Sequence, residues 1–342
     1  MQFPLGPFLT LEILELEKQS INVLTLQLIL FMPISNRQFL KPAPNFIIID
    51  SSAVLHRAWH ALPKLTDTNH KPINALYGFT VVLLKLLREY QPDYLACAFD
   101  TAAPTFRHKL FKEYKATRIP QPQEFYDQIP RAKELLKNLN IKIYEKEGFE
   151  ADDFIAQLKE SAPSFFKIIV SGDMDVFQLI DTETCVYFLR QGIKKIQIYK
   201  EEEIKKRFEL SPQQLVDYKA LRGDPSDNIP GVPGIGDKTA KELLKKFGTL
   251  ENIYEHLKLP PTSWQIKKTL GENLLSHYSE ACLAKKLSIL KRNSEISINL
   301  KDCVLTMPDI SYIKEYFEKL GFKSLIPKID ESLLVKKQKK LL

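Results

Sequence analysis

The chain has 342 residues, which is longer than one average domain and enough to bury a substantial core. Hydrophobic residues make up 44% of the sequence and charged residues 27%, a balance that argues against both a wholly disordered chain and a membrane protein. The 49 lysines and arginines exceed the 42 acidic residues and give a net charge of +7, which suits a polyanionic partner.

The first 44 residues differ from the rest of the chain. They contain the apolar stretch VLTLQLILFMPI, which Pro33 interrupts and acidic residues precede. A secretory signal needs a basic start and a small-residue cleavage site, and a membrane span needs a longer apolar run. We interpret residues 1–44 as an extension of unknown role, with Met32 as a candidate start of the protein.

A regular alternation of strands and helices begins at Asn45. Short apolar runs predict strands at NFIIID, YLACAFD, IKIYEK, FKIIVSGD and CVYFLR. Amphipathic segments around YGFTVVLLKLLREY, IPRAKELLKNL and ADDFIAQLKE predict the helices between them. This βαβ pattern predicts an α/β core over residues 45–205, with a mostly parallel sheet covered by helices on both faces.

The remaining sequence is predicted to be helical. EEEIKKRF and SPQQLVDYKAL begin this region, with Ser211 as the N-cap of the second helix. A glycine-rich turn, GVPGIG, leads to the basic stretch QIKKTLGENLLSHYSEACLAKKLSIL and to a last helix, SYIKEYFEKLGF. We therefore expect a helical region over 206–328 and a frayed charged tail over 329–342.

Nine carboxylates occupy places where strands end or helices begin. They are Asp50, Asp100, Glu150, Asp152, Asp153, Asp173, Asp175, Asp224 and Asp227. Taken singly, each could terminate a strand or cap a helix. Ligands collect at the carboxyl ends of parallel strands, and carboxylates this dense repel one another unless a cation neutralises them.

The types of residue in this set select the metal and the reaction. Oxygen ligands without His or Cys favour Mg²⁺ or Mn²⁺. The four cysteines are scattered, form no C-x-x-C pair and have no His at zinc spacing, so the sequence predicts neither a zinc site nor a disulfide framework. Calcium storage is disfavoured because no EF-hand spacing is present. The set suits phosphodiester hydrolysis, in which two metals about 3.5–4 Å apart activate water and hold the leaving oxygen.

Several motifs occur in an order that resembles the 5′-nuclease domain at the front of bacterial DNA polymerase I, and so the flap endonuclease family. They are FIIIDSS, AWHALPKLTD, YGF, FDTAAPTFRHKLFKEYKATR, EADD, SGDMDVFQLI and LRGDPSDNIPGVPGIGDKTAKELL. The resemblance covers about residues 45–328. It implies a PIN-like fold with a helical arch at about 104–128, a helix-three-turn-helix at about 222–248, and removal of 5′ flaps or primers from DNA.

The resemblance also divides the carboxylates between two Mg²⁺ sites, at which Mn²⁺ can substitute. Asp50, Asp100, Glu150, Asp152 and Asp153 would line the first site, and Asp173, Asp175, Asp224 and Asp227 the second. In the arch, Lys115 and Arg118 could place two cations on the scissile phosphate, and the ring of Tyr114 could stack on an unpaired base.

Other basic and glycine residues are assigned to DNA binding. Arg57 and Arg107 are phosphate contacts by resemblance, and without the resemblance each would be interpreted as an exposed surface cation. The glycine-rich turn before a helix N-terminus forms an anion site from Gly234, Gly236, Lys238 and Thr239. Resemblance further implies a K⁺ ion held by carbonyl groups of this turn.

The chain departs from the family pattern at two positions. Ser51 replaces the usual glycine after the first aspartate, and Met174 replaces the usual lysine in SGD-x-D. Both changes leave the carboxylates in place, so they affect the expected rate more than the expected reaction.

The function expected from the sequence is that of a structure-specific 5′-3′ nuclease. We expect a monomer that does not bind membranes and that acts beside a separate DNA polymerase and ligase, because the resemblance leaves no room for a polymerase domain. A bacterial protein would be cytoplasmic and nucleoid-associated, and a eukaryotic one could be organellar. Two alternatives stay open, a non-catalytic binder of branched DNA and a toxin-like ribonuclease.

Overall fold

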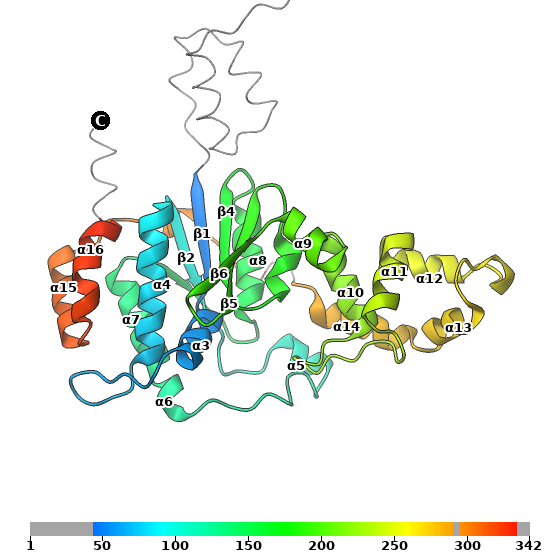
Figure 1. Ribbon diagram of the computed structural model, residues 1–342, viewed down its shortest axis with the longest axis horizontal. Coiled ribbons are helices and arrows are strands. Elements are labelled where there is room, and N and C mark those ends of the chain that lie inside the picture. Colours follow the sequence, from blue (N-terminus) through cyan, green and yellow to red (C-terminus); the bar gives the residue numbers. More distant parts are fainter. Residues whose placement is uncertain (1–43, 291–294, 334–342) are drawn as a thin grey trace, which may run out of the picture. The chain divides into compact units, whose positions relative to one another are not determined.

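The computed structural model describes residues 44–290 and 295–333, and the predictions for residues 1–43 and 334–342 lie outside these ranges (Figure 1). A six-stranded sheet in the order β3-β2-β1-β4-β5-β6 forms the centre. Its strands are β1 (Asn45–Asp50), β2 (Tyr94–Ala98), β3 (Lys142–Tyr144), β4 (Phe166–Ser171), β5 (Thr184–Gln191) and β6 (Lys195–Tyr199).

The pairing confirms a mostly parallel sheet. β1 pairs in parallel with both β2 and β4, and the pairs β2–β3 and β4–β5 are also parallel. Only β5 and β6 are antiparallel within the described sheet. β6 was not predicted from the sequence, because KIQIY is short and alternates polar with apolar residues and so does not form an apolar run. The parallel strands bring their carboxyl ends to one edge of the sheet.

Helices cover both faces of the sheet. One face packs against α3 (Ser51–Ala61), α4 (Asn74–Tyr90) and α7 (Gln128–Asn138), and the other against α8 (Ala151–Ser161) (Figure 1). Successive residues of β1 point to opposite faces, so that Ile47 and Ile49 belong to the first core and Phe46 and Ile48 to the second. Burial on both faces explains why the strand reads as a continuous apolar run.

A helical region follows the sheet, as the sequence predicts. It comprises α9 (Glu201–Phe208), α10 (Leu215–Arg222), α11 (Asp237–Phe247), α12 (Leu250–Leu257), α13 (Lys268–Ser276) and α14 (Tyr278–Ser288). A separate apolar cluster joins α10, α11, α12 and α14. Ser211 precedes the short 3₁₀ turn η3 (Pro212–Gln214), which leads directly into α10.

The predicted boundary of the helical region at residue 328 is wrong. α15 (Ile310–Lys319) and α16 (Ile326–Leu333) return to the α/β core beside α4, where Ile313, Phe317 and Ile329 are fully buried (Figure 1). An amphipathic helix has the same sequence pattern whichever apolar surface it covers, so the pattern did not reveal this return.

The predicted helical arch is also largely non-helical. Between residues 104 and 128 the structure contains α5 (Phe106–Leu110) and α6 (Gln123–Tyr126), joined by turns and extended chain. Between α5 and α6, Pro120 and Pro122 disfavour a helix, and Lys115 has a positive φ of 56°, which interrupts a right-handed helix. Separately, no helix within the described ranges is long and apolar enough to cross a membrane.

Candidate active site

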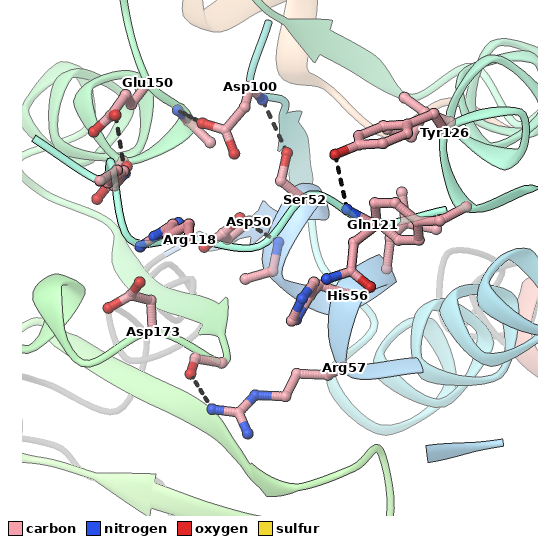
Figure 2. Close-up of a pocket in the computed structure, with 18 of the residues that line it drawn as sticks. Asp50, Ser52, His56, Arg57, Asp100, Arg118, Gln121, Tyr126, Glu150 and Asp173 are labelled. Carbon is pink, nitrogen blue, oxygen red and sulfur yellow. Dashed lines mark hydrogen bonds and ion pairs between the residues drawn. The ribbon is translucent and has the colours of Figure 1, made fainter. Parts of the chain in front are cut away.

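An open cleft of about 2240 Å³ lies at the carboxyl edge of the sheet. Its wall includes the five predicted carboxylates Asp50, Asp100, Glu150, Asp152 and Asp173. Figure 2 shows four of these, Asp50, Asp100, Glu150 and Asp173, grouped around the side chain of Arg118. The fold thus gathers acidic side chains from segments more than a hundred residues apart.

Asp50 links the end of β1 to the start of α3. It is the N-cap of α3, and one of its oxygens accepts a hydrogen bond of 2.9 Å from the Ala53 amide. Its second oxygen accepts a bond of 2.7 Å from the Ser171 hydroxyl at the end of β4. The capping role considered for this residue is therefore present, and it fixes the carboxylate at the cleft.

Asp100 and the start of α8 form the opposite side of the acidic group. The Asp100 amide donates to the Ser52 hydroxyl at 2.9 Å, and its carboxylate accepts from the Ala151 amide at 2.8 Å. Glu150 is the N-cap of α8 and is only 5% exposed. These contacts hold both carboxylates beside a helix N-terminus, which favours negative charge.

Asp153 and Arg107 differ from their predicted roles. The Arg107 side chain is 1% exposed and donates to both Asp153 oxygens at 2.9 Å, to Glu150 at 3.1 Å, and to the carbonyl oxygens of Leu287 and Ile289. Asp153 is fully buried, and a metal there would have to displace this guanidinium. The prediction that Arg107 contacts DNA is wrong in this structure, because the side chain does not reach the surface.

The remaining carboxylates, Asp175, Asp224 and Asp227, are not among the residues that line the cleft, and each pairs with a basic side chain. Asp175 begins the 3₁₀ turn η2 (Asp175–Leu179), and its amide donates to Asp173 at 3.0 Å. Asp224 and Asp227 lie in the loop after α10, where Gly223 has a φ of 81° that only glycine adopts readily. Lys219 contacts both Asp175 and Asp224.

Tyr114 does not have the predicted exposed ring. It is 3% exposed, and its hydroxyl donates to Glu150 at 3.0 Å and to Asp227 at 3.1 Å. The prediction that this ring stacks on an unpaired base is therefore wrong in this structure. Tyr114 instead joins Glu150 at the start of α8 to Asp227 in the loop after α10.

Lys115 and Arg118 lie at the acidic group, although not on one helix. Lys115 Nζ is 2.9 Å from Glu150 Oε1, and Arg118 Nη2 is 2.5 Å from Asp227 Oδ1. Both residues line the cleft, and 49% of the Arg118 side chain is exposed. A phosphate could therefore reach Arg118 without any rearrangement of the core.

Arg57 and Met174 lie along the same cleft. Arg57 projects from α3 and donates to the Gly172 carbonyl oxygen at 2.6 Å (Figure 2). Met174 is 44% exposed, and its sulfur accepts a contact of 3.3 Å from the guanidinium of Arg207. A cation of α9 thus stands beside the position where the family pattern has a lysine. Ser51, the other departure, is fully buried.

The predicted anion site forms the start of α11. Gly236 is its N-cap, and a Cβ added at Gly234 or Gly236 would meet nothing within 4 Å. The Lys238 side chain is 89% exposed, and Thr239 is partly exposed beside it. The helix N-terminus and its cation are therefore accessible to a ligand.

The donor set fits divalent cations. Burial and the charge of Asp100 raise the pKa of Asp50 to about 7, and burial and then Glu150 raise the pKa of Asp152. Crowding of this kind is relieved by a hard cation with oxygen ligands. Among the described residues no three acidic, His or Cys side chains are already arranged around one point, because basic side chains are interposed.

Three residues at the site were missed by the sequence analysis. Ser52 and Ser171 position Asp100 and Asp50, and Lys219 bridges two carboxylates. The serines lie next to strand ends, a position that could have indicated them. Lys219 lies in the last turn of α10, five residues before Asp224, and this closeness in the sequence was the available signal.

Comparisons with known proteins give a family and a fold. The model for the 5′-3′ exonuclease N-terminal resolvase-like domain matches residues 45–209, and that for the 5′-3′ exonuclease C-terminal SAM fold matches residues 210–311. DNA polymerase I of Bacillus caldotenax is 40% identical over 84% of the chain, and that of Bacillus subtilis strain 168 is 36% identical over the same share. The chain spans about a third of the length of these relatives, 32% in each case.

Solved structures support the same fold. The T5 D15 protein, co-crystallised with metal ions, has a TM-score of 0.60 at 19% identity and covers 85% of this chain and 99% of its own. The T5 5′-exonuclease with bound zinc has a TM-score of 0.60 at 21% identity, covering 84% and 98%. The catalytic core of Rad2 in complex with DNA substrate has a TM-score of 0.56 at 20% identity, covering 85% and 92%.

Proposed function

The chain belongs to the 5′-3′ exonuclease family, and on that premise we propose that it is a structure-specific 5′-nuclease that hydrolyses phosphodiester bonds of DNA in the cleft. The observation that carries the proposal is the convergence of five carboxylates on one open cleft, with cations along its wall. Its substrates would be 5′ flaps, nicks and primer ends. It would act beside a DNA polymerase and a ligase in primer removal or repair.

The carboxylates would hold two Mg²⁺ ions, with Mn²⁺ as a substitute. Asp50, Asp100, Glu150 and Asp152 would provide ligands of the first ion, and Asp173, Asp175, Asp224 and Asp227 those of the second. Bound there, the ions would generate a hydroxide nucleophile from water and stabilise the leaving oxygen. Asp153 would act through Arg107, which fixes the start of α8 and with it Glu150.

The basic residues of the cleft would bind and orient the substrate. Arg57 is held by the Gly172 carbonyl and is preorganised to contact a phosphate. Lys115 and Arg118 now pair with carboxylates, and would exchange these partners for a phosphate when DNA and metal arrive. Arg207, fixed by Tyr199 and Met174, would contribute the cation that position 174 lacks.

The decisive experiment compares cleavage of a 5′-labelled DNA flap with and without Mg²⁺. We expect cleavage near the branch point with Mg²⁺ or Mn²⁺ and none in a chelator, because the carboxylates alone offer no neutral-pH nucleophile. Single-stranded RNA serves as the second substrate. Tight flap binding without cleavage would favour the non-catalytic alternative, and preferential cleavage of the RNA would favour a ribonuclease.

A second prediction concerns the predicted DNA-binding site at the N-terminus of α11. Replacing Lys238 by alanine should weaken duplex binding at every sequence and lower the salt-dependence slope of log Kd by about 1, because one phosphate contact is lost. Fluorescence anisotropy over a series of KCl concentrations measures both quantities. K⁺ would bind carbonyl groups of the preceding turn, so the series is repeated in NaCl.

The matched control is Lys246, which lies in the last turn of the same helix. Its replacement by alanine should leave the slope unchanged, since it is remote from the helix N-terminus. Equal effects of the two substitutions would show that net charge alone determines binding, and would remove the turn as the specific contact.

A further inference from the structure

Lys219 neutralises two carboxylates that come from different segments of the chain. Its ammonium donates to Asp175 Oδ1, at the start of η2, and to Asp224 Oδ2 at 2.6 Å, in the loop after α10. The lysine side chain is 19% exposed and each carboxylate is 12% exposed. The three groups thus form a compact, mostly buried ion cluster.

No other basic side chain in the described part of the chain forms an ion pair with these two carboxylates. Arg118 and Lys115 pair with Asp227 and Glu150, and Arg107 pairs with Glu150 and Asp153. Asp175 and Asp224 have ion pairs only with Lys219 among the described residues. The usual pKa of a lysine side chain is about 10.4, so its amino group carries a positive charge at neutral pH.

We propose that Lys219 is a built-in counter-ion that competes with a divalent cation for Asp175 and Asp224. Asp175 and Asp224 would contribute oxygen ligands to a divalent cation, and the lone pairs that they would use now accept from the Lys219 ammonium. Lys219 therefore weakens the second metal site in the free protein and keeps its two carboxylates together when no metal is present. The inference rests on the proposed metal-dependent function.

The alternative is that Lys219 is a structural ion pair without influence on metal binding. The chain contains a matched pair for this comparison. Lys285 of α14 bridges Asp217 at 2.6 Å and Glu251 at 2.7 Å, and its side chain is 24% exposed, which is close to the value for Lys219. Its partners are outside the cleft and outside the nine predicted ligands.

The test measures Mn²⁺ binding to the full chain without DNA, by calorimetry and by the EPR signal of free Mn²⁺. Lys219→Met should tighten the weaker Mn²⁺ site at least tenfold, or add a site that the wild type does not fill, because the competing charge is gone. Lys285→Met should leave both the number and the affinity of the sites unchanged. Lys219→Arg, which keeps the charge, should bind as the wild type does.

Thermal unfolding provides a second readout. In a chelator, Lys219→Met should have a lower Tm than the wild type, since two carboxylates then face each other unpaired, and added Mn²⁺ should raise its Tm more than that of the wild type. Lys285→Met should lose stability without this rescue. Lys219→Gln covers the case in which the methionine variant does not fold, because glutamine can still donate hydrogen bonds.

The outcomes separate this inference from the proposed function. If the wild type binds Mn²⁺ and the Lys219→Met and Lys219→Gln variants bind it with the same affinity, the proposed role of Lys219 is overturned. The metal-dependent function would not be affected by that result. Tighter binding in Lys285→Met as well would also overturn it, because any loss of positive charge would then suffice. No Mn²⁺ binding to any variant would contradict both the inference and the metal-dependent function.

Discussion

Replacing Arg107 by methionine is expected to lower the free energy of unfolding by about 3–5 kcal/mol, the usual cost of leaving a buried charge without its partner. The guanidinium makes five hydrogen bonds, to two carboxylates and two carbonyl groups, and is 1% exposed. Methionine fills much of the space but leaves Asp153 in the core without an ion-pair partner, whereas Glu150 keeps its contact with Lys115. Urea unfolding followed by circular dichroism measures the change.

Two further variants distinguish the buried ion pair from a DNA contact. Lys109 lies on the same short helix and is exposed, so that Lys109→Met should change stability by no more than about 0.5 kcal/mol. Adding Asp153→Asn to Arg107→Met should recover part of the loss, because it removes the buried charge that has lost its partner. A stable Arg107→Met protein whose only defect is weak DNA binding would restore the original interpretation of Arg107.

The sheet and the carboxylates could be predicted because their signals are local. A strand buried on both faces is a continuous apolar run, and an aspartate at its end, such as Asp50, is visible in the sequence. Parallel pairing then determines that Asp50, Asp100 and Asp173 meet at one edge. The antiparallel strand β6 and the return of α15 and α16 to the core beside α4 depend on partners distant in the sequence, which a local pattern does not identify.

The roles of the basic and aromatic residues were harder to predict because burial decides them. Arg107 and Arg57 have the same side chain, yet one is enclosed between α8 and the end of α14 and the other lines the cleft. The sequence does not show whether Tyr114 acts through its ring or its hydroxyl group. Because the side chain is buried, its hydroxyl group hydrogen-bonds to Glu150 and its ring is not exposed for stacking. Lys219 was overlooked because a lysine in a helix is usually a solvated surface residue.

Asp50→Asn is expected to reduce flap cleavage in Mg²⁺ by at least about a thousandfold, since loss of a ligand charge removes several kcal/mol of transition-state stabilisation. Asparagine has nearly the same shape, and its oxygen can still accept from the Ala53 amide. Its amide group can donate to Ser171 in place of the hydroxyl bond that Asp50 accepts. The substitution therefore removes charge and leaves the cap intact. Single-turnover cleavage of the labelled flap measures the loss.

Stability in a chelator separates this charge effect from damage to the fold. Burial and Asp100 raise the pKa of Asp50 to about 7, so the ionised carboxylate disfavours the folded state increasingly as the pH rises from about 4 through 7. Asp50→Asn lacks this penalty and should be at least as stable as the wild type at pH 8, by urea unfolding in EDTA. The control is Asp93→Asn, which precedes β2 at the opposite edge of the sheet and should cleave normally. Undiminished cleavage by Asp50→Asn would exclude it as a metal ligand, and a clear loss of stability would show that the cap, and not the charge, accounts for its effect.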